Sequence, residues 1–198
     1  MIGRRFRIVL APLLAALFVF SAAAWAGEPT DQLKVRVEQV IAVLRDSALK
    51  EKKEERRTKI RSIIMKAFDF EAMARSALGA HWNKLKPEQR KEFVDLFSNL
   101  VERTYIGKIE LYTDETVRYT GERVDKSYAT VDTIVSSKKQ EVPIRYSLHK
   151  KDAGWQVYDV TIEGNRLVRN YRDQFQSILR RSSYEELVKS LRAKQHEG

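Results

Sequence analysis

The sequence predicts a single α+β domain in which helices come first, an antiparallel sheet follows and helices close the chain. Three changes of pattern support this prediction. Apolar residues recur every three or four positions up to about residue 111, alternate with polar residues between residues 116 and 162, and return to helical spacing from Leu167 onward. This order of elements is typical of helices packed over one face of an antiparallel sheet.

The first 26 residues have the features of an export signal. Three arginines lie within residues 4–7, residues 8–20 are apolar, and Ala24-Trp25-Ala26 forms an A-x-A cleavage site. The apolar run is shorter than the roughly 20 residues that span a bilayer, which favours a cleaved signal over an uncleaved anchor. We therefore expect an exported mature domain of residues 27–198.

Size and charge indicate one domain that meets anionic partners. The mature chain is large enough for one apolar core, and the absence of cysteine excludes thiol chemistry and disulfides. The net charge is +10, and loss of the three signal arginines lowers it to +7. Because acids and bases alternate, as in residues 51–57, anionic lipid or an acidic protein surface fits an exported chain better than nucleic acid does. A plain solvated helical surface is the alternative for most of these charges.

Four helices are expected before the sheet. Apolar side chains form one stripe over residues 31–49 and, after a charged stretch, a second stripe over residues 60–68. Asp69 is expected to cap a third helix over residues 70–78. The fourth and longest covers residues 87–111 and starts with a proline, which the first turn of a helix favours.

Four antiparallel strands connected as a meander are expected next. Alternation places them near residues 116–119, 129–135, 142–148 and 155–162, with a turn at residues 151–154. The last strand carries apolar residues on both faces, so one face is expected to cover a core and the other a cavity or a helix.

Two helices are expected after the sheet. Leu167, Tyr171 and Phe175 share one helical face, and Ser183 with Glu186 matches the S-x-x-E capping box that opens a last helix.

The chain lacks the residue patterns that catalysis or metal binding requires. Its histidines, His81, His149 and His196, are not at metal-ligand spacing, and His149 and His196 are expected at the surface. No nucleophile elbow and no glycine-rich phosphate loop occur. We therefore expect no metal, no cofactor and no catalytic residue.

Asp159 is the one carboxylate for which an enzymatic role can be argued. On a partly buried strand it could act as the general base of a small conical α+β isomerase. A buried aspartate is more often held by a backbone amide or by an arginine such as Arg145 on the adjacent strand, and we favour this structural role.

Two parts of the sequence form long, dispersed motifs. The first consists of Trp155–Gly164, Leu167, Asn170-Tyr171-Arg172 and Phe175. The second consists of Phe68-Asp69-Phe70, Met73-Ala74, Leu78-Gly79, Trp82, Pro87-Glu88-Gln89-Arg90 and Phe93. The first resembles the closing signature, and the second the helical half, of the MlaC family of periplasmic phospholipid-binding proteins from toluene-tolerance type ABC transport systems. Two departures are Lys86, where a side-chain oxygen cap is common, and Asn165-Arg166, which replace a more apolar pair.

The resemblance implies a cystatin- or NTF2-like layer arrangement with an apolar cavity between sheet and helices. It also implies a monomeric carrier without a cofactor that shuttles phospholipid across the Gram-negative periplasm and maintains outer-membrane lipid asymmetry. Its implied partners are an outer-membrane lipoprotein complex and an inner-membrane ABC transporter with an MCE-type subunit. A hopanoid or another hydrophobic ligand, the isomerase and a scaffold subunit with a filled core are the alternatives.

Candidate site residues follow from these expectations. The residues expected to line an acyl-chain pocket are Phe68, Phe70, Met73, Leu78, Trp82, Phe97, Leu100, Val101, Tyr105, Val131, Ile144, Tyr146, Val160, Ile162, Tyr171 and Phe175. Those expected at a head-group rim are Arg75, Lys84 and Arg172.

Overall fold

A computed structural model describes residues 28–111, 115–137 and 140–195, so the expected signal segment lies outside the described residues. The helices are α1 (Glu28–Arg45), α2 (Lys53–Ala67), α3 (Phe70–Leu78), α4 (Pro87–Glu110), α5 (Leu167–Arg181) and α6 (Tyr184–Gln195), with short 3-10 helices η1 (Ser47–Leu49) and η2 (Gly79–Lys84). The strands are β1 (Thr116–Asp125), β2 (Tyr128–Ser136), β3 (Glu141–Lys151), β4 (Gly154–Ile162) and β5 (Asn165–Arg166).

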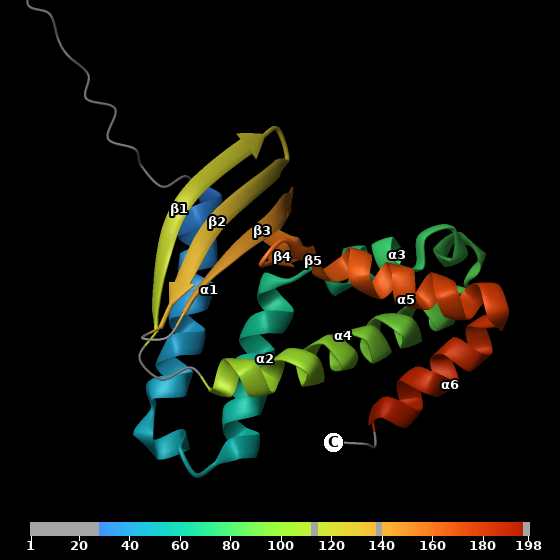
Figure 1. The fold of residues 1–198 in the computed structure, drawn as a ribbon, viewed down its shortest axis with the longest axis horizontal. Coiled ribbons are helices and arrows are strands. Elements are labelled where there is room, and N and C mark those ends of the chain that lie inside the picture. The colour runs from blue at the N-terminus through green and yellow to red at the C-terminus, as the bar shows by residue number, and fades with distance from the viewer. Residues whose placement is uncertain (1–27, 112–114, 138–139, 196–198) are drawn as a thin grey trace, which may run out of the picture.

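The sheet is antiparallel, with its strands in chain order from β1 to β5. In Figure 1 it stands on the left, and α3, α4, α5 and α6 form a layer on the right. The α+β prediction is confirmed, but the sheet has five strands and not four. The extra strand, β5, pairs with the end of β4 across a turn in which Glu163 and Gly164 have positive φ. Two residues are too few for alternation to reveal a strand.

The first helix ends earlier than its apolar stripe suggests. Asp46 accepts a hydrogen bond from the Ala48 amide at 2.9 Å and opens η1 in place of a further α-helical turn. The charged stretch that was expected to separate two stripes belongs to α2, which begins at Lys53.

The caps of α3 and α4 are formed by local side chains. Asp69 accepts a hydrogen bond from the Ala72 amide at 2.9 Å, and Gly79 ends α3 with φ 57° and ψ −131°, a conformation that excludes most side chains. Lys86 has no side-chain oxygen that could cap α4, but the Gln89 side chain accepts a hydrogen bond from the Lys86 backbone amide at 2.9 Å. The expected bounds of α3 are therefore confirmed.

A bulge in β4 explains why this strand is apolar on both faces. Leu148 pairs with Val157, but the next pair is Ser147 with Asp159, so Tyr158 is an extra residue. Before the bulge the odd-numbered residues of β4 face the helices, and after it the even-numbered residues do. The apolar residues on either side of the bulge therefore face the helices together, and no second covered face is needed.

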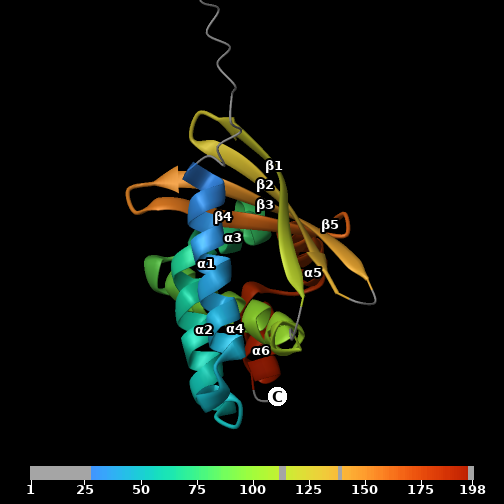
Figure 2. The same cartoon turned by 90° about the vertical axis from the view of Figure 1, so that its left-hand side faces the viewer.

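Helices cover one face of the sheet. The closest approaches to the sheet are made by α1, α2, α3 and α5, and Figure 2 shows α1 and α2 side by side beneath it. Two apolar clusters result, one among α3, α4, α5 and α6 and one between the sheet and α1. Phe68, between α2 and α3, packs against both clusters. No helix in the described part of the chain combines the length and the apolar character that crossing a bilayer requires.

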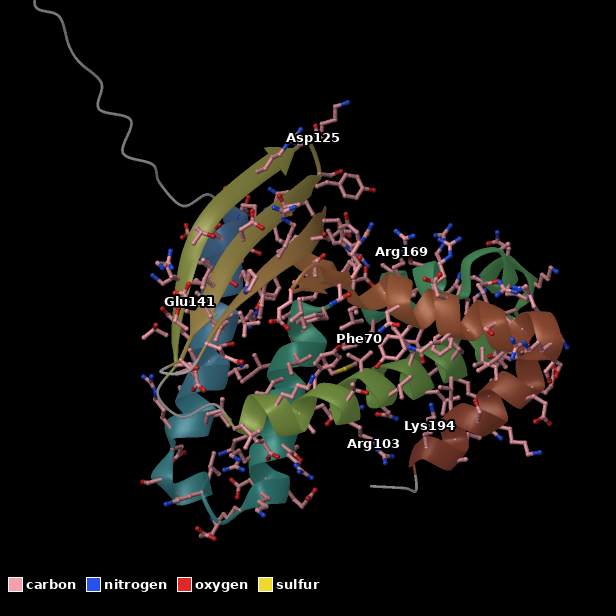
Figure 3. The ribbon with its side chains drawn as sticks, viewed as in Figure 1. Phe70, Arg103, Asp125, Glu141, Arg169 and Lys194 are labelled. Atoms are coloured by element: carbon pink, nitrogen blue, oxygen red, sulfur yellow. The ribbon has the colours of Figure 1, made fainter. Side chains whose placement is uncertain are left out.

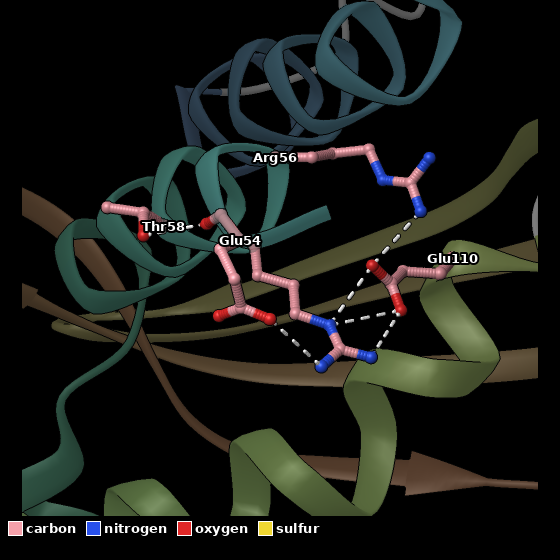
Figure 4. Close-up of polar contacts among 5 residues, drawn as sticks. Glu54, Arg56, Thr58 and Glu110 are labelled. Atoms are coloured by element: carbon pink, nitrogen blue, oxygen red, sulfur yellow. Dashed lines mark hydrogen bonds and ion pairs between the residues drawn. The ribbon is translucent and has the colours of Figure 1, made fainter. Parts of the chain in front are cut away.

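Ion pairs join α2 to the end of α4. Glu110 accepts hydrogen bonds from Arg56 at 3.1 Å and from Arg57 at 3.0 Å, and Arg57 also faces the exposed Glu54 at 3.7 Å (Figure 4). The Glu110 side chain is only 11% exposed. The Arg57 and Arg56 guanidiniums outweigh the effect of burial and lower the pKa of Glu110.

Replacing Glu110 by glutamine should destabilise the domain by about 1–3 kcal/mol at pH 7, because two arginines lose their shared buried partner. A lowered folded-state pKa means that this contribution is complete above the unfolded-state value of about 4.3 and is lost as pH falls through the folded-state pKa. Urea unfolding between pH 7 and pH 3 measures both effects. Glu54→Gln is the matched control, since Glu54 is 90% exposed, and a loss as large as that of Glu110→Gln would contradict the assignment.

Candidate ligand-binding site

The inner face of the sheet is not covered evenly by helices. On β3, Ile144, Tyr146 and Leu148 alternate toward the helices, and Leu148 is 1% exposed whereas the other two are only partly buried. On β2, Val131 is fully buried but Val135 is partly exposed. Coverage therefore decreases along both strands toward the β2–β3 connection.

Helix α4 also keeps some apolar surface accessible. Leu100 and Tyr105 on α4 are only partly buried, although Phe97 on the same helix is fully buried. Burial nevertheless raises the pKa of the Tyr105 and Tyr146 phenols. These side chains are in contact with protein and still retain some accessible surface.

We call these partly buried residues the inner apolar surface. It consists of Ile64, Phe68, Leu100, Tyr105, Tyr119, Ile144, Tyr146 and Ile162, and all of them pack against one or both apolar clusters. Six of them belong to the sequence-predicted pocket. Ile64 and Tyr119 were not predicted. The helical spacing of Ile64 and the strand alternation of Tyr119 are the sequence signals that could have included them.

The other ten predicted pocket residues are buried in the two clusters. Val131 and Val160 lie in the sheet cluster, and the remaining eight, in the helical cluster, are Phe70, Met73, Leu78, Trp82, Phe97, Val101, Tyr171 and Phe175. Figure 3 shows Phe70 in the centre of the molecule and Arg169 at its edge.

Ring contacts show how tightly the helical cluster is filled. The ring centroid of Phe97 lies 5.3 Å from that of Tyr171 and 5.9 Å from that of Phe175, and the centroids of Phe93 and Phe175 lie 5.7 Å apart. All three ring pairs are arranged edge to face. These rings complete one another's packing. The helical cluster is therefore densely packed, whereas the inner apolar surface is only partly covered.

Asp159 has a structural role in the fold. Its carboxylate accepts hydrogen bonds from the Val160 and Val168 amides at 2.9 and 3.1 Å and pairs with Arg166 at 2.8 Å. It thereby ties the start of α5 to β4. The expected partner Arg145 was wrong, because Arg145 pairs with Asp132 on the outer face of the sheet at 2.6 Å.

His149 is not a free surface residue, contrary to expectation. Its Nε2 lies 2.9 Å from Asp69, which Lys151 also contacts at 2.8 Å. Burial acts to raise the pKa of Asp69, but hydrogen bonds from Lys151 and the Ala72 amide outweigh it and lower the pKa. The cluster holds the start of α3 against the end of β3. The described residues contain no group of three acidic or histidine side chains placed to hold a metal ion.

Two of the predicted rim residues come together and the third does not. Arg75 and Arg172 line a polar groove of about 580 Å³ along the exposed side of α3, and Lys84 is not among its lining residues. We call it the α3 groove. It is lined by Asp69, Glu71, Ala72, Arg75, Ser76, Gly79, Ala80, Asn83, His149, Lys151 and Arg172.

Comparison with known proteins places this fold in a family. The model of the MlaC protein family matches residues 34–193. The intermembrane phospholipid transport system binding protein MlaC of Haemophilus influenzae is 20% identical over 138 residues, which are 67% of this chain and 64%, less than two thirds, of that relative. A phospholipid-binding protein of Ralstonia solanacearum, solved in complex with a phospholipid, is 28% identical with a TM-score of 0.79, and the match covers 85% of this chain and 97% of that chain. The chain belongs to the MlaC family.

Proposed function

We propose that this protein is a periplasmic phospholipid carrier whose inner apolar surface receives the acyl chains. The observation that carries the proposal is the partial exposure of Tyr146 and Ile144 on the face of β3 that points toward the helices. The fold of the Ralstonia relative, solved with a phospholipid, supports this ligand class. The export signal expected at residues 1–26 supports the location.

The energetics of such a carrier require apolar shelter and no chemical step. Two acyl chains with roughly 30 methylenes gain on the order of 24 kcal/mol on leaving water, at about 0.8 kcal/mol each. A membrane offers nearly the same gain as an apolar protein interior. Transfer between the two is therefore close to neutral, so one protein can both load and unload.

We further propose that the lipid moves between an outer-membrane lipoprotein complex and an inner-membrane ABC transporter with an MCE-type subunit, which maintains outer-membrane lipid asymmetry. The name of the Haemophilus relative, which places it in an intermembrane phospholipid transport system, supports this assignment. Because transfer of lipid between membrane and protein is close to neutral, these partners set the direction of lipid movement. We assign no enzymatic activity, and the hydrogen bonds that occupy Asp159 support this view.

Native mass spectrometry of the purified mature protein tests the carrier function. We expect a population with a bound diacyl phospholipid, identified by mass in an organic extract. A hopanoid in the extract would change the ligand class. Protein that is empty and takes up no phosphatidylglycerol from vesicles would contradict the proposal.

A further inference from the structure

The α3 groove is polar and follows α3 along its exposed side. Its lining residues on α3 run from Glu71 to Gly79, about 12 Å at 1.5 Å per residue, and it continues to Lys151 at one end and Asn83 at the other. An extended peptide advances about 3.3 Å per residue, so the groove has the length of a short extended segment. No lining side chain is an apolar group larger than alanine. The groove is therefore not a continuation of the inner apolar surface.

The charges in the groove are unequally satisfied. Asp69 forms an ion pair with Lys151 and contacts His149, whereas among the described residues neither Arg75 nor Arg172 has a carboxylate at ion-pairing distance. Each guanidinium has five N–H donors in a planar fork that suits a carboxylate. Two unpaired arginines thus line the same groove and lack an acidic partner.

One of these arginines lies against the backbone at the end of α3. The Arg172 guanidinium lies against Gly79, so close that a Cβ there would be 3.3 Å from Nη2. This is the carboxyl end of α3, where carbonyl groups favour a cation. Arg75 lies one turn earlier on α3, and its carbonyl accepts the Gly79 amide. The helix end therefore holds Arg172 beside the turn that carries Arg75.

We propose that the α3 groove binds an acidic, extended segment of a partner protein, with its carboxylates on Arg75 and Arg172. Ser76 and Asn83, which are both exposed, supply further hydrogen bonds to the peptide. The length of the groove favours a peptide over a single phosphate. The inference deepens the proposed carrier function by naming the chemistry of a docking partner, and its test does not depend on bound lipid.

Fluorescence anisotropy with a labelled hexapeptide of alternating glutamate and aspartate tests the groove. We expect the mature protein to bind this peptide, to ignore its glutamine and asparagine counterpart, and to bind less tightly as NaCl is added. The double variant R75Q/R172Q should bind about tenfold more weakly or worse, because two charge-assisted contacts are lost. The matched control R123Q/R181Q removes two exposed arginines elsewhere and should stay within about twofold.

Several outcomes would overturn the inference. They are absence of peptide binding, equal weakening in both double variants, and a requirement for Arg75 and Arg172 in binding phosphatidylglycerol vesicles or inorganic phosphate but not the peptide. Backbone NMR of the unaltered protein provides a second measurement if R75Q/R172Q does not fold. The amides of Ser76 and Asn83 should then shift on peptide addition, and unchanged amides would contradict the site. Bound lipid is read by mass in the unaltered protein, so failure of the carrier proposal is detected separately from failure of peptide binding.

Discussion

Replacing Ile144 by glutamate should remove lipid binding and leave the fold intact. Ile144 lies on the inner apolar surface and is only partly buried, so a longer side chain has room there. A bound acyl chain would have to displace water from the new carboxylate without offering it a hydrogen bond. We expect lipid affinity to fall by at least about a hundredfold, roughly 2.7 kcal/mol, as measured by uptake from vesicles.

Ile134→Glu is the matched control for this change. Ile134 is also partly buried, but it alternates with Thr133, the partner of Ile144, and so lies on the outer face of the sheet. Its replacement should leave lipid uptake within about twofold of the unaltered protein. Equal losses of uptake in the two variants would place the acyl chains elsewhere.

Replacing Phe97 by alanine should destabilise the domain by about 3–5 kcal/mol, a large part of the 5–15 kcal/mol typical of a folded domain. Phe97 is fully buried and contacts the rings of Tyr171 and Phe175, so truncation leaves a cavity in the helical cluster. Urea unfolding of the lipid-free protein measures the loss.

Leu100→Ala separates packing from ligand contact. Leu100 is on the same helix but only partly buried, so the lipid-free protein should lose less than about 2 kcal/mol. If the acyl chains occupy the inner apolar surface as proposed, the lipid-bound protein should lose more, because the ligand would cover this side chain. If Leu100→Ala and Phe97→Ala cost the same without lipid, the division between filled core and inner apolar surface is wrong.

Local signals in the sequence were sufficient for most elements of the fold. Asp69 and Gly79 delimit α3 because a short acceptor and a residue without a side chain suit the two ends of a helix. The fifth strand was not predicted, because it has only two residues. The bulge at Tyr158 was not predicted, because alternation along one strand assumes an uninterrupted register. The register shift is visible only in the pairing of β4 with β3.

The candidate site was less predictable than the fold. Composition identifies Phe97 and Leu100 equally well as apolar helix residues, but only the packing of α4 against its neighbours decides which of them is fully covered. Likewise, nothing local links His149 to Asp69, which lie 80 positions apart. Tertiary contacts of this kind follow from the crossing of elements and not from spacing along the chain.

Because β4 contains one extra residue, this strand should tolerate the loss of that residue better than the loss of a residue that follows it. Tyr158 itself is only partly buried and makes edge-on contact with Tyr128, so many side chains fit at this position. Deleting it would leave Val157 and Val160 two positions apart, as in a regular strand, so Val160 and Ile162 would still face the helices. The loss of a residue after the bulge would instead reverse the facing of every later residue of β4.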